Sequence, residues 1–191
     1  MAHRKPIKYT ARDGMTIEGY LTLPKDGEGK NLPLIVNPHG GPWARDTWGF
    51  NPEHQFFASR GYAVLQMNFR GSTGYGRQHL ESGYKKWGRE MQNDITDGVK
   101  WAIEQGIADE DRVCIYGASY GGYATMAGMT FTPELYKCGV NYVGVTDVAL
   151  LFETMPKRWS LGAETMKEQV GDPDSEEEFL AEISPVNHVD K

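Results

Sequence analysis

The sequence predicts an α/β fold with a mostly parallel sheet and an antiparallel hairpin at its N-terminal end. Between residues 32 and 145, short apolar runs alternate with helical patterns, which is typical of parallel strands covered on both faces. Ahead of them, residues 6–12 and 15–23 flank Asp13-Gly14, a dipeptide that favours a two-residue hairpin turn. Residues 16–23 also alternate polar and apolar side chains, as a half-buried strand does.

The elements after the hairpin follow from periodicity and from capping residues. A helix is expected to begin at Asn51-Pro52, because asparagine caps helices and proline suits the first helical position, and to end at Gly61. Residues 95–103 place four apolar side chains on one face of a second helix. The other expected elements are strands at 32–36, 62–69, 112–116 and 138–145, and helices at 120–130 and behind a capping box at 175–178.

The composition is that of one globular domain. The 191 residues carry 20 basic and 26 acidic side chains, and residues 171–191 hold seven of the acids, so the acidity is local. We therefore expect no general affinity for nucleic acid or for anionic membranes. No apolar run reaches the ~18 residues that a membrane span needs, and the first ten residues contain no apolar signal segment. We expect this chain to be cytoplasmic, while the compartment of a longer parent protein stays open.

The cysteines and two of the histidines receive structural interpretations. Cys114 and Cys138 are too few for a disulfide framework or a zinc site, and both lie in apolar stretches, so we expect buried free thiols. His54 and His79 lack metal-ligand spacing with other donors and are expected at the surface. No metal and no cofactor are implied.

One motif has the context that nucleophilic catalysis requires. Residues 117–122, GASYGG, match G-x-S-x-G between an expected strand and an expected helix. In such a turn Ser119 is forced into a strained conformation that projects its hydroxyl above the sheet, and its neighbours must be small because strand and helix approach closely. The alternative is a structural turn whose serine has no chemical role.

A second motif supplies what such a serine needs. Residues 39–42, HGGP, directly follow a strand, and an oxyanion formed during acyl transfer requires two preorganised donors. One donor would be the backbone N–H of Tyr120, and the other would come from Gly40 or Gly41. The alternative is an ordinary Gly-Gly turn. Where a serine nucleophile lies in a strand–turn–helix of this kind, the catalytic residues follow one another along the chain in the order Ser, acid, His. His39 precedes Ser119, so we expect it to shape the loop and not to be the catalytic base.

Two further features are weaker. Residues 70–76, RGSTGYG, match neither a phosphate-binding nor a dinucleotide-binding loop, and by themselves they indicate a flexible loop. Asp94 and Asp97 resemble paired catalytic carboxylates, but both are expected near a helix start, so capping is the favoured interpretation.

Together these loops resemble a known family. HGGP, FRGSTGYG and GASYGG, in this order, with NDITDGVKW at 93–101 and SPVNHVDK at 184–191, are similar to the catalytic domain of prolyl oligopeptidase-family serine peptidases, in the acylaminoacyl-peptidase and dipeptidyl-peptidase branches. The resemblance implies an α/β-hydrolase fold that is incomplete at the C-terminal side. Residues 1–5 would be a tail and residues 6–191 a partial peptidase domain.

The resemblance also implies roles for individual residues. Ser119 would be the nucleophile, with the amides of Tyr120 and Gly41 as oxyanion donors. The ring of Tyr120 and the side chain of Val145 would line the pocket for a peptide substrate. In the family a β-propeller usually precedes this domain, and the triad Asp and His lie in loops that would follow residue 191.

Without the triad Asp and His, the expected activity of this chain changes. His188 with Asp147 or Asp172 could in principle close a compressed triad, but the favoured interpretation is a chain that lacks its base and is inactive alone. The strand at 138–145 would then be an exposed sheet edge that promotes self-association. The alternative functions are a carboxylesterase, many of which carry HGGG instead of HGGP, and a non-catalytic binding module of the same fold.

Overall fold

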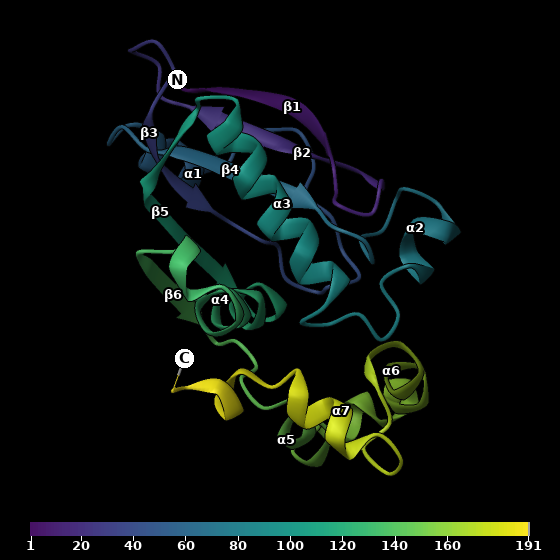
Figure 1. Ribbon diagram of the computed structural model, residues 1–191. Coiled ribbons are helices and arrows are strands. Elements are labelled where there is room, and N and C mark those ends of the chain that lie inside the picture. The colour runs from purple at the N-terminus through teal and green to yellow at the C-terminus, as the bar shows by residue number, and fades with distance from the viewer. Residues whose placement is uncertain (191) are drawn as a thin grey trace.

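The computed structural model describes residues 1–190 and contains one six-stranded sheet (Figure 1). Its strand order is β1-β2-β4-β3-β5-β6, in which β1 and β2 and also β2 and β4 pair antiparallel and the other neighbours pair parallel. This arrangement confirms the mostly parallel sheet with an N-terminal hairpin. The strands are β1 (His3–Thr10), β2 (Thr16–Leu23), β3 (Leu32–Val36), β4 (Ala63–Asn68), β5 (Ala108–Ala118) and β6 (Cys138–Tyr142).

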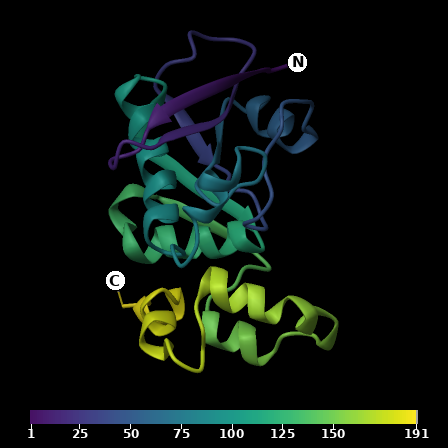
Figure 2. The same cartoon turned by 90° about the vertical axis from the view of Figure 1, so that its right-hand side faces the viewer.

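Helices cover both faces of the sheet. Helix α1 lies on the opposite side from α3 and α4, and α5 to α7 form a further layer beyond α4 (Figure 2). Three short 3-10 turns connect these elements, at Pro133–Leu135, Lys157–Gly162 and Pro185–His188. The α-helices are α1 (Pro52–Ala58), α2 (Arg77–Glu81), α3 (Glu90–Glu104), α4 (Tyr120–Phe131), α5 (Val148–Glu153), α6 (Ala163–Val170) and α7 (Glu177–Glu182).

The N-terminal hairpin differs in detail from its prediction. Strand β1 begins at His3, inside the segment expected to be a tail, and Thr10 pairs with Thr16. The connection is therefore five residues long instead of two. It is closed by the N–H of Ala11, which donates to the carbonyl of Met15 at 2.8 Å.

The predicted capping holds at one helix and fails at another. The Asn51 side chain accepts a hydrogen bond from the His54 amide at 3.0 Å, and Pro52 opens α1 as expected. Helix α7 also forms, but its N-cap is Glu176, which makes no side-chain cap, so the predicted capping box is wrong. The Glu176 carboxylate instead accepts from the amide of Asp172, at 2.9 Å, and from the ammonium of Lys85, at 2.7 Å.

Asp94 and Asp97 do not cap α3, because the helix begins several residues before them. Asp94 is fully buried and accepts hydrogen bonds from the backbone N–H of Arg70 at 2.9 Å and from its guanidinium at 2.7 Å. Arg70 also pairs with Asp13 at 2.7 Å, whereas Asp97 pairs with the half-exposed Arg12. The loop at 70–76, which looked flexible in isolation, is thus attached to α3 and to the hairpin.

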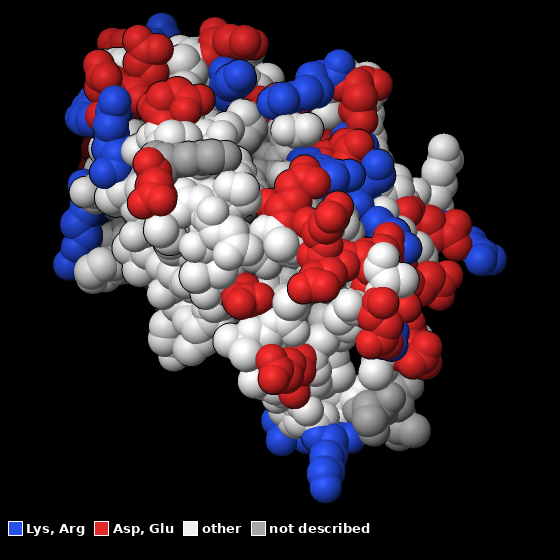
Figure 3. All heavy atoms as spheres, turned by 60° about the horizontal axis from the view of Figure 1, so that its bottom comes forward, with Lys and Arg blue, Asp and Glu red and all other residues white. Residues whose placement is uncertain are grey.

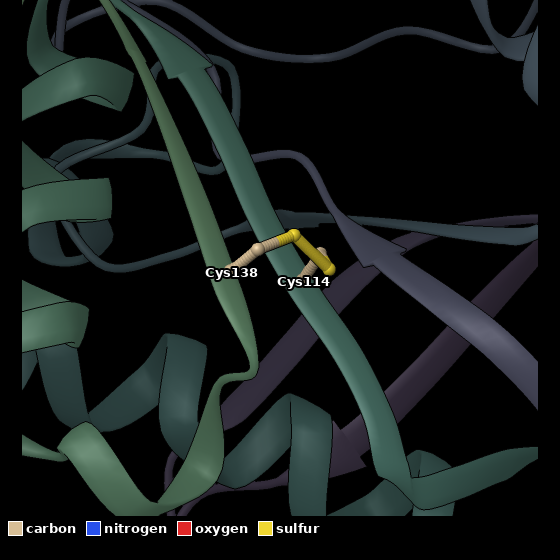
Figure 4. The surroundings of a disulfide bond; sticks show 2 residues. All are labelled: Cys114 and Cys138. Carbon is tan, nitrogen blue, oxygen red and sulfur yellow. A yellow bond between two sulfur atoms is a disulfide. The ribbon is translucent and has the colours of Figure 1, made fainter.

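The cysteines are not free thiols. Cys114 and Cys138 occupy the same register position on β5 and β6, with their Cα atoms 4.8 Å apart, and they form a disulfide (Figure 4). Neither is fully buried, and Cys138 is exposed. The prediction failed because strand pairing, which decides which two side chains become neighbours, is not visible in the local sequence.

The two histidines expected at the surface are buried. His54 is 1% exposed, and its Nε2 contacts the Asn37 side-chain oxygen at 2.8 Å. Burial lowers the pKa of His54 to about 4, with a smaller contribution from Arg4, so its imidazole is neutral. His79 is also buried, and its Nε2 lies 3.1 Å from the carbonyl of Phe69.

Strand β6 lies at the edge of the sheet, as predicted for this segment. All five of its residues are exposed, and it ends at Tyr142 instead of Val145. Val143, with φ 48°, turns the chain out of the strand. Only β5 pairs with β6 within residues 1–190.

Acidic side chains gather on the face that carries α6 and α7 (Figure 3). Several are paired: Lys167 contacts Asp172 and Asp174, and Lys85 contacts Glu176. These acids are therefore partly neutralised by neighbouring lysines at the surface. In the part of the chain that the structure describes, no helix has the length and apolar character to cross a bilayer.

The buried Arg70–Asp94 pair predicts a large difference between two aspartates on the same helix. Asp94→Ala should lower the free energy of unfolding by about 3 kcal/mol, because it leaves the Arg70 charge buried with only Asp13 beside it. Asp97→Ala, the matched control, should cost clearly less, about 1 kcal/mol, because its partner Arg12 is half exposed and is left in water, although Asp97 accepts from both the guanidinium and the amide of Arg12. Urea denaturation of the three proteins measures both values, and equal losses would contradict the assignment.

Candidate active site

Ser119 occupies the turn between β5 and α4. Its backbone has φ 56° and ψ −119°, a left-handed conformation that a non-glycine residue adopts only under constraint from its surroundings. Its amide donates to the carbonyl of Tyr142 on β6 at 3.0 Å, and the residue itself is exposed. The predicted strained serine at a strand–helix turn is therefore present.

Two glycines make this turn possible. A Cβ atom at Gly117 would lie 2.4 Å from the carbonyl carbon of Gly121, so the end of the strand and the first turn of the helix are in backbone contact. A Cβ atom at Gly121 would lie 2.2 Å from the carbonyl oxygen of Pro38. The missing side chains thus bring strand, helix and the loop after β3 together.

The loop at 39–42 lies against the serine. A Cβ atom at Gly40 would be 3.6 Å from the Cβ of Ser119 and 3.2 Å from the carbonyl oxygen of Ala118. Gly41 has φ 124°, which L side chains rarely adopt. The structure therefore brings together Ser119, Gly40 and Gly41, the three residues that the sequence had placed in one site.

His39 holds this loop in place. Its ring stacks on Phe69 with centroids 4.4 Å apart, its Nδ1 lies 2.7 Å from the carbonyl oxygen of Gly40, and its Nε2 lies 2.9 Å from the hydroxyl of Ser72. Burial lowers the pKa of His39 to about 4, so the ring is neutral at pH 7. Because a carbonyl only accepts, Nδ1 carries the hydrogen and Nε2 accepts from Ser72.

The hydrogen bond from His39 has a consequence for the neighbouring peptide. In a planar trans peptide the carbonyl oxygen and the following N–H point in opposite directions. Holding the Gly40 oxygen therefore sets the direction of the Gly41 N–H, the expected oxyanion donor. This agrees with the prediction that His39 shapes the loop instead of acting as the base.

The contribution of the 70–76 loop to this site was not predicted from the sequence. Ser72 is fully buried and bonds His39, and Thr73 donates its amide to the carbonyl of Ala44 at 2.9 Å. The bond between Arg70 and Asp94 anchors the start of the same loop. The many glycines of RGSTGYG indicated a loop that could approach other backbone closely. They did not indicate that Ser72 would contact His39.

The ring of Tyr120 does not lie where the sequence predicted, in the wall of a substrate pocket. Its side chain is 1% exposed and packs among aromatic rings, with centroids 4.7 Å from Trp87, 5.4 Å from Phe69 and 5.5 Å from Tyr123. The phenol therefore faces the core and does not line a substrate pocket, because the first turn of α4 points it inward. Only the backbone amide of Tyr120 remains at the site. Val145 lies beyond the end of β6 and is partly buried against the core.

The compressed triad is not assembled. The ring of His188 makes an edge-on contact with Phe131, the last residue of α4, and so lies roughly 18 Å along that helix from Ser119. Asp147 caps α5 through the amide of Leu150, and Asp172 pairs with Lys167. Within residues 1–190 the Ser119 hydroxyl has no hydrogen bond to a histidine or a carboxylate.

The low pKa of His39 predicts a pH-dependent contribution to stability. Between about pH 6.5 and pH 4 the unfolded chain protonates His39 but the folded chain does not, so acidification favours unfolding. The stability advantage of the unmodified protein over His39→Gln should therefore shrink by up to about 3 kcal/mol across this range and stay constant above it. Urea denaturation at several pH values measures the difference. A pH-independent difference would mean that His39 is not held neutral.

Comparison with known proteins agrees with this geometry. The family model described as prolyl oligopeptidase family matches residues 48–191. Dipeptidyl aminopeptidase BIII of Pseudoxanthomonas mexicana is 42% identical over 97% of this chain and 28% of its own length. An acylamino-acid-releasing enzyme of Arabidopsis thaliana is 34% identical over 68% of this chain and 18% of its own length.

A solved structure shows the same fold. The puromycin-hydrolyzing peptidase of Mycobacterium tuberculosis superposes with a TM-score of 0.90, at 29% identity, over 99% of this chain and 29% of its own. The fold is that of an α/β-hydrolase, and the chain spans less than a third of the length of these relatives. The strained Ser119 and the adjacent glycine loop agree with the family match over residues 48–191. This chain therefore belongs to the prolyl oligopeptidase family of serine peptidases.

Proposed function

We propose that Ser119 is the nucleophile of a peptidase that cleaves short peptides by acyl transfer. The observation that carries the proposal is the exposed serine at φ 56° in contact with the Gly40–Gly41 loop. Its hydroxyl oxygen attacks the peptide carbonyl carbon and loses its proton to a base. The resulting oxyanion accepts hydrogen bonds from the amides of Tyr120 and Gly41. The leaving amine takes up a proton, and water then releases the acyl group from Ser119.

The class of substrate is proposed from the names of the relatives. The relatives include proteins named for dipeptidyl and acylamino-acid release, which favours short peptides as substrates. Val145 remains the proposed contact for the substrate side chain next to the cleaved bond, since it follows the strand that holds the Ser119 amide. The buried ring of Tyr120 is left out of this role.

The base is proposed to lie outside this polypeptide. Each of the histidines at 39, 54, 79 and 188 makes another contact, and none bonds Ser119. A serine hydroxyl without an adjacent base is a weak nucleophile. The 191-residue chain alone should therefore turn over peptides at a negligible rate. The open edge at β6 also supports the proposal that isolated chains self-associate there.

Fluorophosphonate labelling followed by intact-mass measurement tests both parts of this proposal. We expect no stoichiometric adduct on the chain alone, because the Ser119 hydroxyl has no base to accept its proton. Added imidazole, as an external base, should produce a single slow adduct. Ser119→Ala, the matched control, should lose that adduct.

Two results would contradict the proposal in different ways. Rapid stoichiometric labelling without imidazole would show that a base is already present in the chain. An imidazole-dependent adduct that persists in Ser119→Ala, or no adduct under any condition, would remove Ser119 as the activated nucleophile. A second label at Ser72 is not expected, since that side chain is buried against His39.

A further inference from the structure

The disulfide lies on an accessible part of the molecule. Cys114 and Cys138 join β5 to β6 at the same register position, and Figure 4 shows the bond bridging the two strands side by side. Both residues line a groove of about 590 Å³ on the face that α1 covers only in part, together with Phe57, Tyr116 and Val140. Cys138 is exposed, so a small thiol reagent in solvent can reach the bond.

Apart from the disulfide, β6 is held by one neighbouring strand and by helix α4. It pairs only with β5 in the described chain, and its apolar side chains Val140 and Tyr142 are 54% and 61% exposed. On the opposite face α4 packs on β6, where a Cβ atom at Gly139 would lie 2.7 Å from Met129 and 3.2 Å from Thr125. A short edge strand with so little burial opens at low free energy, so a covalent link to β5 contributes a large share of its stability.

The end of β6 is connected to Ser119. The carbonyl of Tyr142 accepts the Ser119 amide at 3.0 Å, and the Asn141 side chain accepts the Gly144 amide at 2.8 Å. A Cβ atom at Gly122 would lie 2.5 Å from that Asn141 side chain. Displacement of β6 therefore changes the contacts that keep the turn at Ser119 in its left-handed conformation.

We propose that the Cys114–Cys138 disulfide is a thiol-exchange site through which a dithiol reductant loosens β6 and the turn at Ser119. A thiolate of the reductant attacks Cys138 Sγ, forms a mixed disulfide and releases the Cys114 thiolate. The second thiol of the reductant then displaces Cys138. The reductant leaves as its own disulfide, and the two cysteines have gained two electrons and two protons.

Amide-resolved hydrogen exchange on the 191-residue chain, measured by NMR before and after dithiothreitol, tests this proposal. Reduction should accelerate exchange at least about tenfold at the amides of β6 and at Ser119. Exchange in β4, at the centre of the sheet, should change less than about twofold. Reoxidation should restore the original rates. The coupling of the disulfide to the Ser119 amide stands even if Ser119 proves to be no nucleophile, because the readout does not depend on activity.

The Cys114→Ser/Cys138→Ser variant is the matched control. It should exchange rapidly at β6 and Ser119 and should not respond to dithiothreitol. If the variant does not fold, reversal of the effect by reoxidation of the unmodified protein serves the same purpose.

Three results would overturn the proposal. Alkylation of two thiols in the unreduced, folded protein would show that the bond does not form. Reduction that proceeds only in denaturant would show that the bond is inaccessible. Unchanged exchange at β6 after the mass has risen by two hydrogens would show that the bond does not hold the strand.

Discussion

The close backbone approach at Gly117 and Gly121 is the constraint on which the candidate site depends. With no side chain at either position, β5, α4 and the loop after β3 meet within contact distance. The chain turns from strand to helix in this small space at Ser119, whose φ is 56°. The strain at the serine is maintained by contacts on three sides, which also keep Gly40 beside it.

The polar side chains around the site hold the Gly40–Gly41 loop in position through hydrogen bonds. His39 is neutral because burial opposes its charge, and this neutrality lets one ring nitrogen donate to Gly40 while the other accepts from Ser72. Ser72 belongs to a loop whose first residue, Arg70, forms a buried pair with Asp94 on α3. The orientation of the proposed oxyanion donor thus depends on a helix that does not itself reach the site.

The centre and the β6 edge of the sheet differ in how deeply their strands are buried. The central strand β4 and the second half of β3 are buried, whereas β6 is exposed throughout its length. Ser119 lies at the boundary, because its backbone is bonded to β6 and its neighbours pack into the core. The chain supplies the turn and the glycine loop of an α/β-hydrolase while spanning less than a third of its relatives' length. Within residues 1–190 the Ser119 hydroxyl is not hydrogen-bonded to any of the histidines at 39, 54, 79 and 188.

The sequence by itself determined the local features: the order of the strands and of helices α1, α3, α4 and α7, the cap at Asn51, the turn at Ser119 and the glycine loop, because each depends on neighbouring residues and on periodicity. Helices α2, α5 and α6 were not predicted. It did not determine which distant side chains meet. Asp94 and Arg70, Cys114 and Cys138, and the inward ring of Tyr120 were all misassigned. Their partners are 24 or more positions away or are set by helix packing. Only the tertiary structure decided these contacts, because strand register and burial are properties of the assembled sheet and not of any local segment.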